Sequence, residues 1–144
     1  VQKVAKGIGM DKRIGDKFLH AGPGYGGSCF PKDTLALVKT AQDHDSPVRL
    51  IETTVAINDN RKRAMGRKVI AACDGNVRGK KIAVLGLTFK ANTDDLRESP
   101  ALRLAERLVG RGAQVVAFDP VATDHVSACW LARDLPTAAA TATA

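Results

Sequence analysis

One long stretch without helix breakers limits most strongly what this chain of 144 residues can fold into. After Pro47 the sequence reaches Cys73 with no further proline and a single glycine, Gly66, and its apolar residues recur at helical spacing. The pattern predicts one helix from Pro47 to about Cys73, which at 1.5 Å per residue would be roughly 40 Å long. A helix of that length usually supports more than one small unit, so we expect it at a domain junction or a dimer interface.

The residues after this helix predict a strand–helix–strand unit. Lys81–Leu85 is a short run rich in β-branched and apolar residues, and Gln114–Phe118 is a second run of the same kind. Between them, Ser99-Pro100 opens an amphipathic segment that ends near Gly110. A βαβ unit places its two strands in one parallel sheet, so the sequence predicts an α/β chain.

The residues before the long helix predict shorter helices. Val1–Gly9 has the apolar spacing of a helix end, and Thr34–Asp43 is typical of a helix that Pro31 can open. Ser46 is expected to cap the long helix, with Pro47 as its first residue. The first half of the chain is therefore expected to be helical.

Composition excludes several classes of protein. Hydrophobic residues make up 44% of the chain and charged residues 26%, which is typical of a folded globular protein and not of a disordered or fibrous one. No apolar run is long enough to span a membrane. The net charge of +7 comes mainly from residues 1–78 and suits a nucleic acid, an anionic lipid or a phosphate-bearing small molecule. Aromatic residues are scarce and no nucleic-acid-binding motif occurs, so a nucleic-acid partner is not expected.

The start of the chain and the pattern of its cysteines bear on its cellular compartment. It begins with Val1 and no signal segment follows, so we interpret it as an internal or processed piece of a cytoplasmic protein. Cys29, Cys73 and Cys129 are widely spaced and lack the spacing of a zinc site, so no metal is expected. The pattern suits a reducing compartment, with at most one thiol that does chemistry.

Cys29 is the candidate nucleophile. It follows the glycine-rich segment 22–27 and precedes Pro31, which places it near a helix N-terminus. That helix end and the charge of Lys32 both favour the thiolate, and Asp33 could orient a water or hold the lysine. The glycines formally match the dinucleotide-binding pattern GxGxxG, but no clear strand precedes them. A turn that lets a ligand approach the backbone closely is the preferred interpretation.

Two charged segments are less specific. Lys90 and Arg97 follow the end of a predicted strand, where ligands bind in open α/β sheets, but an ordinary charged loop would have the same pattern. The basic cluster at residues 61–68 is interpreted as a solvated face of the long helix. The polar residues 58–60 interrupt its apolar stripe and are interpreted as facing a cleft.

Two segments on either side of the long helix resemble signatures of the UDP-glucose/GDP-mannose dehydrogenase family. Residues 18–33, Phe-Leu-His-Ala-Gly-Pro-Gly-Tyr-Gly-Gly-Ser-Cys-Phe-Pro-Lys-Asp, are similar to its catalytic-cysteine segment. Residues 86–90, Gly-Leu-Thr-Phe-Lys, and 93–100, Thr-Asp-Asp-Leu-Arg-Glu-Ser-Pro, are similar to the start of its C-terminal domain. The phenylalanine after the cysteine is more typical of members that act on UDP-glucose than of those that act on GDP-mannose. The similarity extends from the first residue to about Pro120.

The resemblance implies an NAD-dependent oxidation of UDP-glucose to UDP-glucuronate. Cys29 would form a thiohemiacetal and then a thioester with the substrate, and Asp33 would position the water that releases the product. Lys32 and Arg97 are implied to face NAD. Substrate contacts are implied for Arg13, Phe18, Leu19, His20, Ala21, Gly22, Tyr25, Gly26 and Lys90.

The resemblance also implies a domain organisation. Residues 1–77 would be the end of a helical central dimerisation domain, and residues 78–122 the start of a Rossmann-like UDP-binding domain. Residues 123–144 are expected to be a divergent, poorly ordered tail. Arg13 would reach the sugar site of a neighbouring subunit, which implies a homodimer through the helix at residues 47–73. The family's NAD-binding fingerprint is not in this sequence, so the isolated chain is expected to have little or no dehydrogenase activity. A dehydrogenase for another nucleotide sugar, or a non-catalytic dimerising UDP-binding module, remains an alternative.

Overall fold

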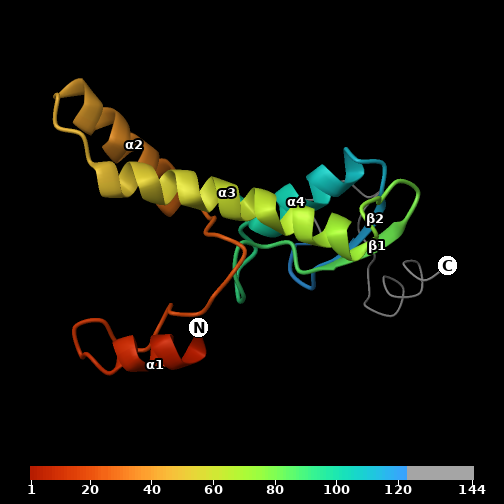
Figure 1. Ribbon diagram of the computed structural model, residues 1–144, viewed down its shortest axis with the longest axis horizontal. Coiled ribbons are helices and arrows are strands. Elements are labelled where there is room, and N and C mark those ends of the chain that lie inside the picture. Colours follow the sequence, from red (N-terminus) through yellow and green to blue (C-terminus); the bar gives the residue numbers. More distant parts are fainter. Residues whose placement is uncertain (123–144) are drawn as a thin grey trace.

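The computed structural model describes residues 1–122, and the predicted tail and Cys129 lie outside the described residues. Within residues 1–122 the chain forms helices and a small parallel sheet, arranged around one long helix (Figure 1). In chain order these elements are α1 (Gln2–Gly9), α2 (Phe30–Asp43), α3 (Arg49–Ala72), β1 (Lys81–Leu85), α4 (Pro100–Val109) and β2 (Gln114–Phe118).

The long helix α3 joins the two halves of the described chain. The helix α2 packs against it in the first half, and α4 packs against it in the second half (Figure 1). The prediction of one uninterrupted helix is confirmed, with an end at Ala72. Because α3 reaches both halves, side chains along its length can contact loops from each of them.

The predicted start of α3 is wrong by two residues. Its N-cap is Val48, which has no side chain able to cap, and not Ser46. The backbone N–H of Ser46 instead donates to the carbonyl of Ala41 at 2.9 Å, which ties Ser46 to the end of α2. Asp45, with φ of 51°, makes the left-handed turn between the two helices. The chain is therefore still leaving α2 where the sequence suggested that α3 begins.

The second half is the predicted βαβ unit. The strands β1 and β2 are parallel, with Lys81 opposite Gln114 and Leu85 opposite Phe118. Both strands have the predicted bounds, and α4 packs against β2 and against α3. The buried core lies here, and its members are Val77, Ala105, Leu108, Ala113 and Val115, with Val69, Ile70, Cys73, Ile82, Val84 and Leu104 packed against them. The α/β prediction is thus confirmed, and Cys73 packs beside this core.

The first half buries little by itself. No residue of α1 is buried, and α2 buries only Ala41. Large apolar side chains on α2 and α3 are exposed instead, among them Leu35, Leu50 and Ile57. Within residues 1–122 no helix combines the length and the apolar character that a membrane crossing requires.

Ser99 joins α4 to the strand end and should be a sensitive point of this fold. Its buried hydroxyl donates to the carbonyl of Leu87 at 2.6 Å and accepts from the N–H groups of Ala101 and Leu102 at the start of α4. The change Ser99→Ala removes a cap and leaves a buried carbonyl without its donor, so we expect it to lower the free energy of unfolding by about 2 kcal/mol. Urea unfolding followed by circular dichroism would measure the loss.

The exposed Ser46 supplies a matched control for that substitution. Because Ser46 does not cap α3, Ser46→Ala should shift the free energy of unfolding by less than about 0.5 kcal/mol. Equal losses in the two variants would contradict the capping role of Ser99.

Candidate functional site

Cys29 is the N-cap residue of α2. Its carbonyl accepts the N–H of Asp33 at 2.9 Å, which is the first bond of the helix. Its side chain is exposed, with the hydroxyl of Ser28 at 3.7 Å from Sγ. The first N–H groups of a helix have no partners inside it and attract negative charge. The predicted place of Cys29 at a helix N-terminus is therefore confirmed.

Two cations from different halves of the chain lie near Cys29. Lys32, on α2, pairs with Asp33, and the hydrogen bond to that carboxylate is the main reason why the pKa of Lys32 is raised. Arg97, in the loop before α4, pairs with Asp95 at 2.9 Å, and this hydrogen bond is the main reason why the pKa of Arg97 is raised. A negative charge on Cys29 adds a smaller upward contribution to the pKa of each. These two cations thus lie where they would attract an anionic group bound at Cys29, and Lys32, Asp33 and Arg97 are open to solvent while the Asp95 side chain is only 13% exposed.

The loop that carries Cys29, residues 22–29, docks directly on the second half of the chain, and we call it the cysteine loop. The N–H of Gly27 donates to the carbonyl of Arg97 at 2.7 Å. A Cβ at Gly26 would lie 2.4 Å from the carbonyl oxygen of Glu98, closer than any side chain can approach. Gly26 was expected to contact a substrate through its backbone, and the structure adds a second reason for a glycine there, because it packs against Glu98.

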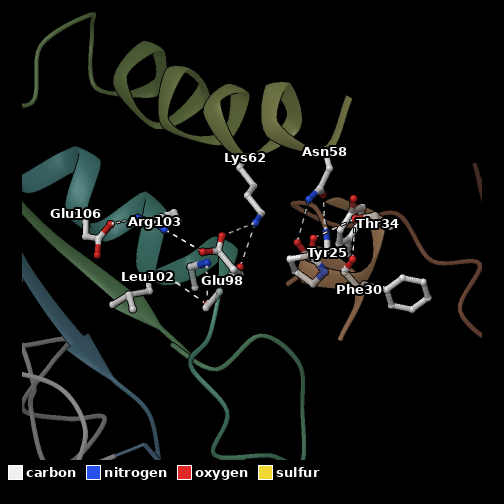
Figure 2. A network of polar contacts seen from close by, with 12 residues as sticks. Tyr25, Phe30, Thr34, Asn58, Lys62, Glu98, Leu102, Arg103 and Glu106 are labelled. Carbon is white, nitrogen blue, oxygen red and sulfur yellow. Dashed lines mark hydrogen bonds and ion pairs between the residues drawn. The ribbon is translucent and has the colours of Figure 1, made fainter. Parts of the chain in front are cut away.

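Side chains from α3 hold the other part of the cysteine loop (Figure 2). The buried Asn58 accepts from the N–H of Tyr25 at 2.8 Å and donates to the carbonyl of the same residue at 3.2 Å. Arg61 donates from Nε to the carbonyl of Gly22 at 2.9 Å. The loop is therefore fixed by its backbone, which leaves the Cys29 side chain exposed.

The sequence interpretation of residues 58–68 is partly wrong. Residues 58–60 were interpreted as facing a cleft; Asn58 is buried beside the cysteine loop, whereas Asp59 and Asn60 are exposed. Lys62 was assigned to a solvated helix face, but only 10% of its side chain is exposed and it contacts Glu98. Neither Lys62 nor Glu98 was identified as a site residue, because their contact joins segments far apart in the sequence and no local pattern reports it.

A surface hollow of about 640 Å³ lies beside the cysteine loop. Ser28 and Lys32 line it from the first half, and Arg97, Arg103 and Glu106 line it from the second. Lys32, Arg97 and Arg103 are donors of the kind that binds phosphate, and each of them is also paired with a carboxylate in this structure. The predicted cofactor residues Lys32 and Arg97 are thus brought together on one hollow.

The other predicted substrate residues are more scattered. Lys90 lies over the ring of Phe89 and lines a second hollow, of about 560 Å³, next to Asp119. Phe18 is 93% exposed and has φ of 62°. Leu19, His20 and Ala21 follow it in the irregular segment that leads to Gly22.

Arg13 lies away from the cysteine loop. It follows α1, which stands apart from α3 (Figure 1), and it pairs with Asp11 while 88% of its side chain stays exposed. The hydrogen bond to Asp11 raises the pKa of Arg13. Within residues 1–122 the structure brings Cys29, Asp33, Lys32, Arg97 and Gly26 together, and it does not bring Arg13 to them. No group of three potential metal-ligating side chains gathers in this part of the chain.

Two family models match the sequence. The central domain of the UDP-glucose/GDP-mannose dehydrogenase family matches residues 1–60, and the UDP binding domain of the same family matches residues 83–144. The second match continues past Pro120, where the resemblance noted from the sequence ended.

Individual proteins of similar sequence or structure are named as UDP-glucose or GDP-mannose dehydrogenases. A UDP-glucose 6-dehydrogenase of Rhizobium meliloti is 76% identical over 120 residues, which are 83% of this chain and 28% of that protein. The structure of a UDP-glucose dehydrogenase from Pyrobaculum islandicum matches with a TM-score of 0.83 and 36% identity, over 94% of this chain and 32% of that one. A GDP-mannose dehydrogenase from Pseudomonas aeruginosa matches with a TM-score of 0.75 and 30% identity, over 98% of this chain and 35% of that one. The chain thus spans less than a third of the curated relative.

Proposed function

Since the chain belongs to the UDP-glucose/GDP-mannose dehydrogenase family, we propose that it carries the cysteine-bearing part of an enzyme that oxidises UDP-glucose to UDP-glucuronate. One observation carries this proposal. The exposed thiol of Cys29 lies at a helix N-terminus, with Lys32 beside it from its own helix and Arg97 from the UDP-binding domain. A cysteine side chain held between two domains suits a nucleophile that acts on a substrate bound across them.

In the proposed reaction, Cys29 holds C6 of the sugar covalently. The C6 alcohol of UDP-glucose first loses a hydride from carbon and a proton from oxygen, which gives an aldehyde. The thiolate sulfur then attacks the aldehyde carbon, the carbonyl oxygen takes up a proton, and the product is a thiohemiacetal. Oxidation removes a hydride from C6 and a proton from its oxygen and leaves a thioester. Water then attacks the thioester carbon, the C–S bond breaks, the carboxylate forms and Cys29 returns as a free thiolate. Asp33, one turn into α2 and open to solvent, would position that water.

The cofactor of this family, NAD, fits the donors on the hollow of about 640 Å³. Lys32 and Arg97 would hold its pyrophosphate, because two cations on one hollow complement a diphosphate. Two NAD⁺ molecules, bound there in turn, would each accept one hydride, one for each oxidation step. The residues of this chain supply binding, orientation and the sulfur nucleophile.

The substrate and partner assignments are part of the same proposal. The UDP-sugar would contact residues 18–26 along the cysteine loop and Lys90 on the second hollow. Arg13, which is free of the cysteine loop in its own chain, would reach the site of a second copy. The exposed apolar side chains on α2 and α3, among them Leu35, Leu50 and Ile57, support a homodimer through the long helix.

Alkylation of Cys29 gives a direct test in the 144-residue chain. Near neutral pH, iodoacetamide should modify Cys29 faster than the partly buried Cys73, because the Cys29 side chain is exposed and lies at a helix N-terminus. Millimolar UDP-glucose should slow the modification of Cys29 about threefold or more by covering the cysteine loop, and it should leave Cys73 unchanged. Peptide mass spectrometry reads both sites in one sample.

GDP-mannose provides the control. GDP-mannose should protect Cys29 less than UDP-glucose does if the UDP-glucose assignment is right. Equal protection by both sugars would favour a dehydrogenase for another nucleotide sugar. No protection by any nucleotide would contradict substrate binding at the cysteine loop.

A further inference from the structure

We propose that Lys62 is a positioning residue that fixes the cysteine loop against the second domain by anchoring the backbone carbonyl of Glu98. A catalytic role for this positioning rests on the proposed function, whereas the anchor itself rests only on the contacts around Glu98. Figure 2 shows Lys62 reaching from α3 toward Glu98, beside the point where Asn58 holds Tyr25.

The ammonium group of Lys62 has one principal partner. Nζ donates to the backbone carbonyl of Glu98 at 3.1 Å and lies 3.6 Å from a carboxylate oxygen of the same residue. The lysine side chain is only 10% exposed. A charged side chain that is this largely covered is favoured by a fixed partner, and Glu98 supplies it.

The same carbonyl is where the cysteine loop meets the second domain. Gly26 packs against it so closely that a Cβ there would lie 2.4 Å away, and the N–H of Gly27 bonds to the preceding carbonyl, that of Arg97. The stem of Lys62 also touches the loop, because a Cβ at Gly24 would lie 3.2 Å from its Cγ. The aliphatic part of Lys62 therefore lies against the cysteine loop, and its ammonium group contacts Glu98 in the second domain.

The backbone at Glu98 needs such an anchor. Its φ is 52°, in the left-handed region that residues other than glycine rarely adopt. Backbone in that region persists where the surrounding contacts hold it. The Glu98 carboxylate is also paired with Arg103 at 3.1 Å, so loss of the lysine would leave the carboxylate partnered and the carbonyl without its side-chain donor. The effect of removing Lys62 should therefore centre on the carbonyl and on the glycines packed against it.

Hydrogen exchange in the 144-residue chain tests the anchor. We expect Lys62→Met to raise the exchange rate of the Gly27 amide about tenfold or more, while the amides of β1 keep their rates. Lys62→Arg, which keeps a charged donor, should restore most of the protection. Lys68→Met, the same substitution at an exposed lysine of α3, should behave as the unchanged chain. If Lys62→Met yields no folded protein, Lys62→Gln takes its place with the same expected result.

The variant Glu98→Gln distinguishes the role of the Glu98 backbone carbonyl from that of its carboxylate. Because it keeps the backbone acceptor, we expect Gly27 protection to stay within about twofold of that in the unchanged chain. An unchanged Gly27 rate in Lys62→Met, an equal rise at Gly27 and in β1, or a loss of protection in Glu98→Gln as large as in Lys62→Met would overturn the proposal. None of these measurements uses a nucleotide, so failure of UDP-glucose to protect Cys29 would refute the proposed function and leave the anchor standing.

Discussion

Replacing Cys29 by alanine is expected to lower the rate of NADH formation about a thousandfold or more in a hybrid dehydrogenase. In that hybrid the matching segment of the Rhizobium meliloti UDP-glucose 6-dehydrogenase is replaced by this chain, which is 76% identical to it over 120 residues. Without the sulfur no thioester can form, so oxidation of UDP-glucose to the carboxylate has no covalent route. Absorbance at 340 nm with UDP-glucose and NAD⁺ measures the rate.

Cys73 offers the matched control for this experiment. It packs beside the core of the second half, away from the cysteine loop, so Cys73→Ala should leave kcat within about threefold of the unchanged hybrid. A hybrid that keeps more than a tenth of its rate after Cys29→Ala would contradict the nucleophile assignment. An inactive unchanged hybrid would count against the proposed activity of this segment.

Replacing Asp119 by alanine is expected to lower the free energy of unfolding by about 3–5 kcal/mol, comparable with the whole stability of a small domain. Asp119 is 3% exposed, and its carboxylate accepts four backbone N–H groups. Two of these donors, Leu87 and Thr88, follow β1, and the other two, Val121 and Ala122, follow Asp119 itself. The alanine variant would leave them without an acceptor. Urea unfolding at neutral pH would measure the change.

The same carboxylate gives the pH dependence of this loss. Burial raises the pKa of Asp119, but the four N–H donors lower it by more, so its pKa lies below the ordinary value. A lowered pKa stabilises the folded state above the unfolded value of about 3.9, and that stabilisation is lost as the pH falls through the folded pKa. The difference between the unchanged chain and Asp119→Ala should therefore shrink below about pH 4.

An exposed aspartate in the same half provides the comparison. Asp94→Ala should change the free energy of unfolding by less than about 0.5 kcal/mol at neutral pH. If Asp119→Ala costs no more than Asp94→Ala, the four hydrogen bonds contribute nothing measurable and this account of Asp119 is wrong.

The sequence predicted well the features that depend on local pattern. The spacing of apolar residues predicted α3, the β-branched runs predicted both strands, and Pro31 after a glycine-rich segment predicted the helix N-terminus at Cys29. Each of these signals lies within the element that it describes, so no knowledge of the tertiary fold was needed.

The features that sequence reasoning missed depend on contacts between distant segments. Lys62 looked like any other residue of a basic cluster, and only the approach of Glu98, which is far along the chain, takes it out of solvent. Serine is a residue type that commonly caps helices, but the N–H of Ser46 donates a hydrogen bond to the end of α2. Sequence patterns report what an element prefers and do not report which neighbour will meet it.

Because α3 is a helix, adding or deleting a residue within it also rotates every side chain that follows. One end of the helix holds α2, its middle holds the cysteine loop through Asn58 and Lys62, and its far end contributes Val69 and Ile70 beside the core. Deleting one residue between Lys62 and Val69 would turn the far end by roughly 100° and draw it in by about 1.5 Å. The cysteine loop and the βαβ unit could not then both keep their contacts. Insertions and deletions should therefore be tolerated in the loops, and not within this interval.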